Sequence, residues 1–573
     1  MILFGDFGVV SIVNRKKWKV IRTIDLSTDA NYKSWALHRY YPRQKELLVW
    51  ADHGYALLYD MRTGKLKKKV NLGRADVAEC EIDRERNRLI TVSKSFVIEV
   101  YDLQTQARVL TVKSQSGDAL FAFTPDNKYM TVGAVGNQIF FRKDGQLYPF
   151  EQFDLHYNRP DLVLKNAGCD DYKYIEALHH AYLKRVKRSG NDIDNREVAH
   201  SPPTITILGK NRLGFTTHTN NLWLNIKASD QESKITHVKV WINKVPIYGK
   251  EGLKIDGDSN IIQESLQLTL SEGKNRVEVA AMNEHGVESA KDYFNIHCLL
   301  KSRDKKVYFI GIGVAAYQQA GYDLTYTTKD VKDLNGALKN RYPNLESILL
   351  LDEEVTTENI LKLRKTLETT GVDDKVIILL SGHGVLDSSM NFFFATHDTD
   401  FEEPGQKAFS YQSLDNLLYG IPARHKLVLL DACFSGEVDS DAELQFAQMD
   451  SSVVQKKTKG ARVVKFNKTA EYHNSFKLMQ HFFNDFSEGN GAIVLSAAGG
   501  DEYALEGGGW QNGVFTYSIL KGLVDMEADQ NLDQTITVQE LTKYVNHKVE
   551  KLTGGRQKPT SRQSNLELDY RVW

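Results

Sequence analysis

The second half of this chain takes its fold from the stretch His425-Lys426-Leu427-Val428-Leu429-Leu430-Asp431-Ala432-Cys433-Phe434-Ser435-Gly436. Its apolar run predicts a buried strand that stops abruptly at an acid, a cysteine and a glycine. An upstream apolar run has the same pattern and ends in Ser381-Gly382-His383-Gly384. In open α/β sheets the ligand crevice lies outside the carboxyl ends of the strands. We therefore expect the Cys433 thiol and the His383 imidazole at one sheet edge, where a cysteine nucleophile and its base belong.

Strands and helices alternate around these two stretches. Short apolar runs predict further buried strands, and amphipathic stretches between them predict helices. This alternation is typical of a mostly parallel sheet that helices cover on both faces. We therefore predict an α/β/α domain over residues 301–573. Its further expected strands are 307–313, 347–351 and 492–496, and its expected helices are 328–342, 357–369 and 413–419.

Residues 1–155 are predicted to be all-β and internally repetitive. Strand residues followed by turn signals recur at 46–64, 88–105 and 128–145, about 40 residues apart. A period of this length is typical of propeller blades, and the region resembles WD-repeat-like blades. Residues 1–30 are a candidate for one more blade, so we expect a small or partial propeller. Blades usually recruit a partner or substrate, and the alternative is an inert packing domain.

A connector and a second β domain are predicted between the two halves. Residues 156–200 are predicted to form a helical connector, because 172–188 has apolar positions at helical spacing. Residues 201–300 contain short alternating strands separated by turn residues, which predicts a β-sandwich. The sandwich resembles the immunoglobulin-like architecture but lacks its Cys…Trp…Cys core. Spacing or docking is its expected function.

Composition and charge narrow the classes of function. The chain has 73 Lys and Arg against 74 Asp and Glu, and this balance gives no general attraction to nucleic acid or anionic lipid. No stretch approaches the roughly 18–20 apolar residues of a membrane span, and we expect no signal peptide. The four cysteines are far apart and form no metal-ligand pairs. We therefore expect a protein of the reducing cytoplasm that binds neither nucleic acid nor membrane.

The two glycine-flanked stretches carry a resemblance to a known family. Ser381-Gly382-His383-Gly384 followed by Asp431-Ala432-Cys433-Phe434-Ser435-Gly436 resembles the caspase and metacaspase group of cysteine peptidases. The resemblance covers roughly residues 303–573 and implies a cysteine endopeptidase. It implies that Cys433 is the nucleophile and that His383 protonates the leaving amine and then activates water. The backbone N–H of Gly384, with that of Cys433, is expected to hold the oxyanion.

The same resemblance implies an acidic pocket for the residue before the cut. Asp431 lies two residues before the nucleophile, and Ser381 lies two residues before the histidine. Asp330 occupies the place of the family's acid after the first strand. Two carboxylates in a partly desolvated pocket suit a guanidinium or ammonium group, so we expect cleavage of protein or peptide substrates after Arg or Lys. The alternative for Asp330 is a helix N-terminal charge that the dipole favours.

Two regions of the second half bear on activation. The interval 437–490 is long and charged, and its basic residues are suitable sites for self-cleavage by such an enzyme; an uncleaved surface insertion is the competing interpretation. Asp529, Asn531, Asp533 and Glu540 follow the spacing of a calcium loop, although Gln534 replaces its glycine. The alternative is a helix N-terminus with a capping box of Thr537 and Glu540. We assign no metal ligands and no required cofactor, and we keep calcium as a candidate activator.

A rival hypothesis makes the chain an interaction scaffold. In that case the peptidase fold is catalytically silent or activated by a partner, and it docks or signals in a signalling or defence system. The presence of His383, Cys433 and the three pocket residues favours an enzyme, because a scaffold would not need all five. The aromatic Trp510 beside Gly509 is expected either to border the substrate groove or to pack as a lid.

Overall fold

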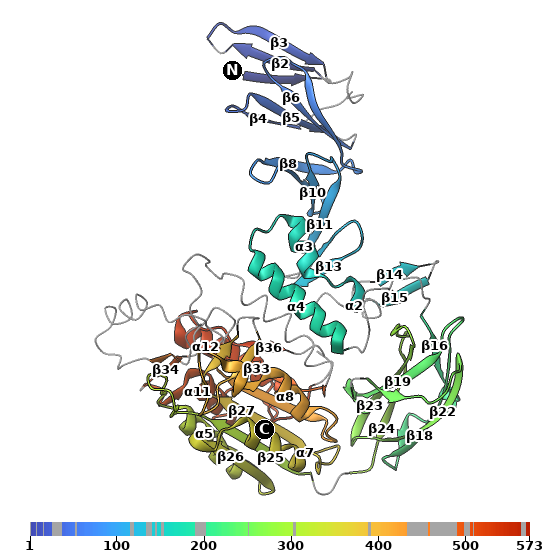
Figure 1. The fold of residues 1–573 in the computed structure, drawn as a ribbon, viewed down its shortest axis with the longest axis vertical. Coiled ribbons are helices and arrows are strands. Elements are labelled where there is room, and N and C mark those ends of the chain that lie inside the picture. Colours follow the sequence, from blue (N-terminus) through green and yellow to red (C-terminus); the bar gives the residue numbers. More distant parts are fainter. Residues whose placement is uncertain are drawn as a thin grey trace. The chain divides into compact units, whose positions relative to one another are not determined.

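The structure is a computed structural model, and it divides into two compact units, Met1–Tyr182 and Leu183–Trp573. We describe each unit separately (Figure 1). No helix in the described part of the chain is long and apolar enough to cross a membrane. The described residues are 2–6, 9–14, 16–25, 37–51, 54–114, 120–132, 140–143, 146–149, 154–188, 202–249, 251–301, 305–387, 391–432, 457–458, 490–497, 505–507, 509–562 and 569–573.

The first unit is built from antiparallel sheets, as the sequence predicts. Its sheets have the orders β1-β2-β3, β4-β5-β6-β7, β8 to β13 in reverse sequence, and β14-β15. The strands are β1 (Ile2–Asp6), β2 (Val9–Asn14), β3 (Lys19–Asp25), β4 (Leu37–Tyr41), β5 (Glu46–Ala51), β6 (Tyr55–Asp60), β7 (Leu66–Asn71), β8 (Val77–Asp83), β9 (Arg88–Ser93), β10 (Val97–Asp102), β11 (Arg108–Ser114), β12 (Leu120–Phe123), β13 (Tyr129–Val132), β14 (Phe140–Lys143) and β15 (Gln146–Pro149).

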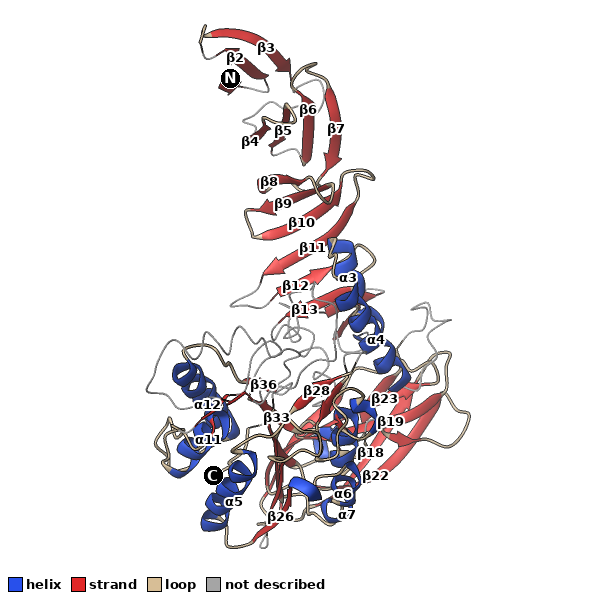
Figure 2. Ribbon diagram, turned by 60° about the vertical axis from the view of Figure 1, so that its left-hand side comes forward, coloured by secondary structure: helices blue, strands red, loops and turns tan. Residues whose placement is uncertain are grey.

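Successive sheets of this unit pack face to face (Figure 2). Strand β5 contributes to the packing on both sides of its sheet, because its side chains alternate between the two faces. Leu47 and Val49 pack against Val10 and Ile12 of the first sheet. Leu48 and Trp50 pack on the other face, against residues of β8 and β9. A strand buried on both faces has a continuous apolar run, which is the pattern of residues 47–51.

The described strands at the start of the third repeat belong to the sheet of the second repeat. Strands β12 and β13 lie where this repeat begins, and β12 pairs with β11, so these strands extend the second repeat's sheet to six strands. Helix α3 (Pro160–Ala167) contacts the same sheet and buries Val163 against Val100 and Leu110. The short helix α2 (Asp154–Tyr157) precedes it and α4 (Tyr172–Arg188) follows. The described strands form stacked open sheets, so the propeller remains a prediction.

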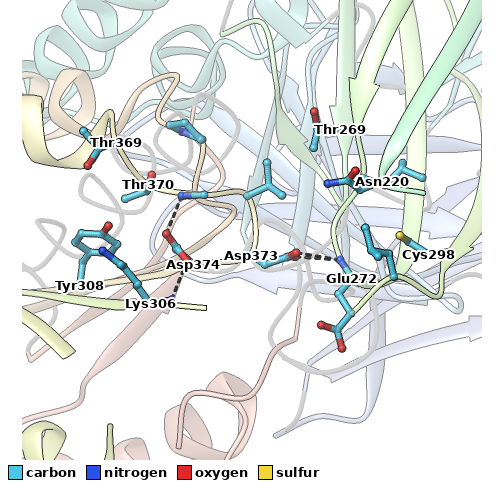
Figure 3. A pocket seen from close by; sticks show the side chains of 15 residues that line it. Asn220, Thr269, Glu272, Cys298, Lys306, Tyr308, Thr369, Thr370, Asp373 and Asp374 are labelled. Carbon is cyan, nitrogen blue, oxygen red and sulfur yellow. Dashed lines mark hydrogen bonds between the residues drawn. The ribbon is translucent and has the colours of Figure 1, made fainter. Parts of the chain in front are cut away.

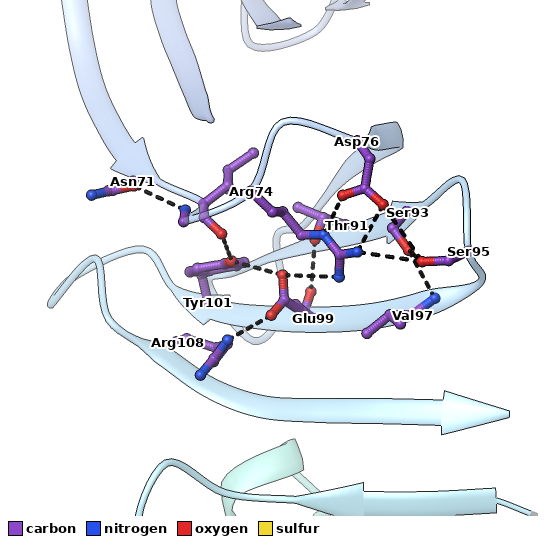
Figure 4. Close-up of polar contacts among 12 residues, drawn as sticks. Asn71, Arg74, Asp76, Thr91, Ser93, Ser95, Val97, Glu99, Tyr101 and Arg108 are labelled. Carbon is purple, nitrogen blue, oxygen red and sulfur yellow. Dashed lines mark hydrogen bonds and ion pairs between the residues drawn. The ribbon is translucent and has the colours of Figure 1, made fainter. Parts of the chain in front are cut away.

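A polar network ties strands of the second repeat together (Figure 4). Glu99 of β10 is 4% exposed and pairs with Arg108 of β11 at 2.6 Å. The hydroxyl of Tyr101 donates to the same carboxylate at 3.1 Å and also to the carbonyl of Leu72 at 2.8 Å. Arg74 lies 3.8 Å from Glu99 and bonds Asp76. Buried charges need such partners, and this network therefore fixes the turn between β7 and β8 against β10.

The second unit begins with a two-layer β-sandwich, as predicted. Its core lies between a sheet of order β16-β18-β22 and a sheet of order β17-β24-β23-β19-β20, with β21 paired to β19. Strand β18 alternates exposed and buried side chains, which is the pattern expected of a strand with one solvated face. The strands are β16 (Thr204–Ile207), β17 (Thr216–Thr217), β18 (Asn221–Ser229), β19 (Ile235–Ile242), β20 (Val245–Pro246), β21 (Leu253–Lys254), β22 (Ile261–Thr269), β23 (Gly273–Asn283) and β24 (Asp292–Cys298).

The rest of this unit is the predicted α/β/α domain. Its sheet has the order β26-β25-β27-β31-β33-β36, and every described pair is parallel except β33 with β36. Helices α6, α7 and α8 pack on one face, and α5, α11 and α12 pack on the other (Figures 1 and 2). The main elements are β25 (Val307–Gly313), α5 (Thr327–Arg341), β26 (Leu345–Leu351), α6 (Thr357–Lys362), α7 (Arg364–Leu367), β27 (Lys375–Ser381), α8 (Tyr411–Leu418), β31 (His425–Asp431), β33 (Ile493–Ser496), α11 (Val514–Val524), α12 (Val538–Thr553) and β36 (Thr560–Arg562).

Two details of this domain follow from single residues. A Cβ on Gly311 of β25 would lie 2.4 Å from the Val331 side chain, so only glycine allows α5 to lie this close to the sheet. The helix expected over 357–369 is divided at Leu363 into α6 and α7. Ile360 of α6, Leu363 at the division and Leu367 of α7 are buried in the same core, whereas Leu361 is exposed.

The sandwich is attached to the α/β/α domain by buried polar contacts. Arg424, just before β31, is 4% exposed and donates to the Ser271 hydroxyl at 2.6 Å and to the carbonyl of Thr269. The backbone N–H of Glu272 donates to Asp373 at 3.0 Å. The strand that leads toward Cys433 therefore begins at the sandwich.

Candidate active site

The two predicted strand ends lie side by side. Strands β27 and β31 pair in parallel, with Ser381 opposite Asp431, and the N–H of Gly382 donates to the carbonyl of Asp431 at 3.2 Å. His383 therefore follows β27 at the level where β31 ends. Cys433, two residues beyond Asp431, lies outside the described residues. The backbone register nevertheless brings the histidine segment and the end of the cysteine strand to one edge of the sheet, as the sequence predicts.

His383 is buried and held by the segment between β25 and α5. Its ring is 3% exposed, and Nε2 lies 2.7 Å from the carbonyl oxygen of Tyr322. Its backbone N–H donates to the Tyr317 hydroxyl at 3.0 Å. Because a carbonyl oxygen only accepts, Nε2 carries a proton, and Nδ1 is the nitrogen suited to proton exchange with a substrate. The ring is surrounded by Tyr317, Tyr322 and Phe401, with centroids 5.1, 6.2 and 5.8 Å away.

The glycines beside the histidine have distinct surroundings. A Cβ on Gly382 would lie 2.9 Å from the Tyr317 hydroxyl and 3.0 Å from the Phe394 ring, so the packing requires glycine. Gly384 is buried and begins β28 (Gly384–Leu386), which pairs with β29 (Phe392–Phe394). The N–H of Ala395 donates to the His383 carbonyl at 2.9 Å. The small sheet thus fixes the backbone on both sides of the imidazole.

The three predicted pocket residues lie together and are completely buried. The Ser381 hydroxyl donates to Oδ2 of Asp330 at 3.1 Å, and the N–H of Gly513 donates to Oδ1 at 3.0 Å. Asp431 accepts from the Thr516 hydroxyl at 2.7 Å. Asp330 also lies in the first turn of α5, where the helix dipole favours a negative charge, as the alternative interpretation expects. Its role in a substrate pocket stays a prediction.

Several functional candidates were not predicted from the sequence. Glu506, in β34 (Leu505–Gly507), is 1% exposed and accepts from the N–H groups of Thr325 at 2.9 Å and Tyr326 at 3.1 Å. Strand β34 is three residues long and has no periodic pattern that could reveal it. The roles of Tyr317 and Tyr322 depend on a loop conformation, which periodicity does not encode. The Thr516 hydroxyl has no signal in the sequence beyond a polar position in an apolar helix.

The candidate calcium loop forms a capped helix start. Thr537 caps α12 and accepts from the N–H of Glu540 at 3.3 Å, while the Glu540 carboxylate accepts from the N–H of Thr537 at 3.0 Å. This confirms the predicted capping box. Asp529 accepts backbone N–H groups of the turn that precedes the helix. Within the described ranges, no three His, Cys, Asp or Glu side chains converge as metal ligands would. Trp510 packs partly buried against the core that contains α11.

A cavity of about 590 Å³ lies between the sandwich and the α/β/α domain, away from these candidates (Figure 3). Its walls come from the amino ends of β25 and β27, whereas His383 follows a carboxyl end. Asp373 and Asp374 line it, and their carboxylates accept the N–H groups of Glu272 and Lys306. Asp373 therefore joins the two parts, whereas Asp374 bonds within the α/β/α domain, and the cavity lies at the opposite end of these strands from His383.

The candidate site lies in a segment that matches a known family model. Residues 309–570 match the family model described as the caspase domain. No curated protein matches the chain. The matched segment contains every residue of the candidate site, from Tyr317 to Thr516.

Proposed function

We propose that the chain is a cysteine endopeptidase that cuts after Arg or Lys, because residues 309–570 match the family model of the caspase domain. One observation carries the specificity. The carboxylates of Asp330 and Asp431 are both fully buried beside the segment that carries His383. Burying two carboxylates is costly unless a cation joins them, and a substrate side chain supplies that cation.

The proposed reaction uses a Cys433–His383 dyad. The Cys433 thiolate attacks the scissile carbonyl and forms a thioester, while the histidine protonates the leaving amine through Nδ1. Water, deprotonated by the same nitrogen, then hydrolyses the thioester. The Tyr322 carbonyl fixes the tautomer and orientation of the ring, because it accepts from Nε2 at 2.7 Å. The N–H groups of Gly384 and Cys433 are the proposed oxyanion donors.

The pocket chemistry favours a guanidinium or an ammonium. Among the described contacts, a hydroxyl and a backbone amide donate to Asp330, and a hydroxyl donates to Asp431. These donors are neutral and orient the two carboxylates. Arg presents a planar fork that can bond two carboxylates at once, whereas Lys presents a point charge. We therefore expect Arg peptides to be cleaved faster than Lys peptides.

Hydrolysis of fluorogenic peptides tests this proposal. The full chain is incubated with peptides that end in Arg, Lys or Asp, with and without calcium as candidate activator, and Cys433→Ala serves as the inactive control. Turnover of Arg and Lys peptides that disappears in the control supports the proposal. Asp431→Asn should lower kcat/KM for Arg peptides by about 100-fold, roughly 3 kcal/mol, because one charge-assisted contact is lost. Cleavage only after Asp would refute the assigned pocket.

Self-cleavage within 437–490 is part of the proposal. Most of this interval lies outside the described residues. Its described part, β32 (Lys457–Thr458), pairs antiparallel with β34, with Lys457 opposite Glu506. The backbone beside a lysine therefore lies along a strand that neighbours the pocket. Mass spectrometry of the purified chain should find cuts after Lys or Arg in this interval, and none in Cys433→Ala; an intact interval in an active enzyme would contradict self-cleavage.

We further propose that the β domains ahead of the peptidase recruit its partner or substrate in the cytoplasm. The competing function is a scaffold that is catalytically silent or activated by a partner. The two are separated by the same peptide assay, because a silent scaffold leaves every peptide intact at any enzyme concentration. A chain that remains uncut and inactive but gains activity with added cell extract would support partner activation.

A further inference from the structure

The segment 314–326 holds the catalytic histidine at two points. It provides the Tyr317 hydroxyl for the His383 backbone and the Tyr322 carbonyl for the His383 ring. A shift of this segment would move the hydrogen-bond acceptor of Nε2 and reorient the imidazole. The position of 314–326 therefore determines whether Nδ1 faces the reacting atoms.

Acidic side chains fix this segment at both ends. At its start, Asp352 accepts from the N–H groups of Ala315 at 2.7 Å and Ala316 at 2.9 Å. At its end, Glu506 accepts from those of Thr325 and Tyr326. Asp352 follows β26, at the outer edge of the large sheet. Glu506 comes instead from β34, on the side of the substrate pocket.

Strand β34 takes part in the pocket in a second way. It pairs antiparallel with β35 (Asn512–Gly513), which places Gly513 opposite Glu506. The N–H of Gly513 donates to Asp330 at 3.0 Å. On its other side β34 pairs with the backbone of β32, again at Glu506. Both edges of β34 are therefore paired in this structure, and a peptide that binds β34 by strand addition has to take the place of β32.

We propose that Glu506 is a positioning residue that couples a peptide strand on β34 to the orientation of His383. This inference rests on the proposed peptidase function. The backbone of Glu506 lies against the added strand, and its side chain holds the end of the histidine segment. Peptide binding that orders β34 therefore also orders the Tyr322 carbonyl. The described side-chain contacts of Glu506 are with the backbone of Thr325 and Tyr326, so the proposed effect passes through 314–326.

Glu506→Gln tests the coupling with little change in shape. The amide keeps one acceptor but directs an NH₂ group at a backbone N–H, so one of the two contacts becomes repulsive. We expect kcat for an Arg peptide to fall about tenfold or more while KM changes by less than about twofold, because the strand edge still binds the peptide backbone. The shorter Glu506→Asp should be impaired as well.

Asp374→Asn is the matched control. Asp374 is 7% exposed and also accepts two backbone N–H groups, those of Lys306 and Gly371, at the opposite end of the sheet. A loss that reflected only weaker folding would lower kcat in both variants alike. Hydrogen exchange of the full chain gives the second readout: amides of 314–326 should exchange faster in Glu506→Gln than in Asp374→Asn.

The outcomes separate this inference from the proposed function. An active wild type with an unchanged kcat in Glu506→Gln would overturn the coupling and leave the peptidase in place. An inactive wild type would overturn the proposed function. The hydrogen exchange of residues 314–326 would then be the remaining test of whether Glu506 positions this segment. Equal exchange of 314–326 in the two variants would overturn its positioning role.

Discussion

Lys426→Met should stabilise the second unit in a way that depends on pH. Lys426 is the second residue of β31 and is 1% exposed, among the apolar residues that pack against α8. Burial, reinforced by the charges of Arg424 and Arg364 and opposed by Asp415, lowers the pKa of this lysine from 10.5 to about 7. Methionine keeps the apolar stem and removes the group that titrates.

The magnitude follows from linkage. Between pH 7 and 10.5 the unfolded chain binds a proton on Lys426 that the folded chain does not bind, so wild-type stability rises with pH across this window. The total rise from this group is roughly 5 kcal/mol, at about 1.4 kcal/mol per pKa unit. The variant lacks this contribution. Its advantage over wild type should therefore be largest at or below pH 7 and should disappear near pH 10.5.

Pulse proteolysis in urea measures this difference on the full chain. Both proteins carry Cys433→Ala, so that the proposed self-cleavage cannot affect the result, and the fraction of the second unit that survives is followed from pH 6.5 to 10. A stability difference that stays constant over this range would refute the reasoning, because loss of packing alone does not depend on pH. A variant that is less stable at pH 7 would refute it as well.

Three further changes test contacts described above. Thr516→Val removes the hydroxyl that donates to Asp431. It should lower the free energy of unfolding by about 1–3 kcal/mol, because a buried acceptor loses its hydrogen bond. It should also weaken the preference for Arg peptides over uncharged peptides in competition assays. Tyr317→Phe should lower kcat several-fold by freeing the His383 backbone, as measured under saturating peptide. Thr537→Ala should cost about 1 kcal/mol in urea unfolding without changing kcat.

Controls for the first two changes come from the same domain. Ser518→Ala removes a hydroxyl that donates only within α11, to the carbonyl of Val514, and should leave peptide selectivity unchanged. Tyr342→Phe removes a hydroxyl bonded to the carbonyl of Val572, far from the histidine, and should leave kcat unchanged. Equal effects of test and control would show that general loss of packing, not the named contact, determines the result.

The sequence predicts the strand ends of the site well and its loops poorly. Ser381 and Asp431 could be placed together because continuous apolar runs end at them, and parallel pairing then sets their register. The region around Glu506 has too few residues for any period to appear. Tyr322 acts through its carbonyl, which every residue possesses, so side-chain identity carries no signal.

In the first unit, too, the sequence predicts local features well and long-range strand pairing poorly. The repeat near 40 residues predicted antiparallel sheets correctly, because alternation and turn signals are local properties. It did not predict that β12 would pair with β11 and extend an existing sheet. Whether a strand starts a new blade or lengthens an existing sheet depends on which sheet edge it can pair with. Such an edge exists only in the folded protein, so a local sequence pattern does not predict it.

The attachment of Arg424 to the sandwich limits how this protein can be dissected. Burial lowers the pKa of Arg424 to about 10, and its guanidinium bonds Ser271 and the carbonyl of Thr269. A fragment that starts at β25 would lose both acceptors at the base of the strand that leads to Cys433. It would also uncover Gly491, which lies against Val245 of the sandwich. Recombinant fragments of the peptidase should therefore begin before β16, and shorter ones should aggregate or lose activity.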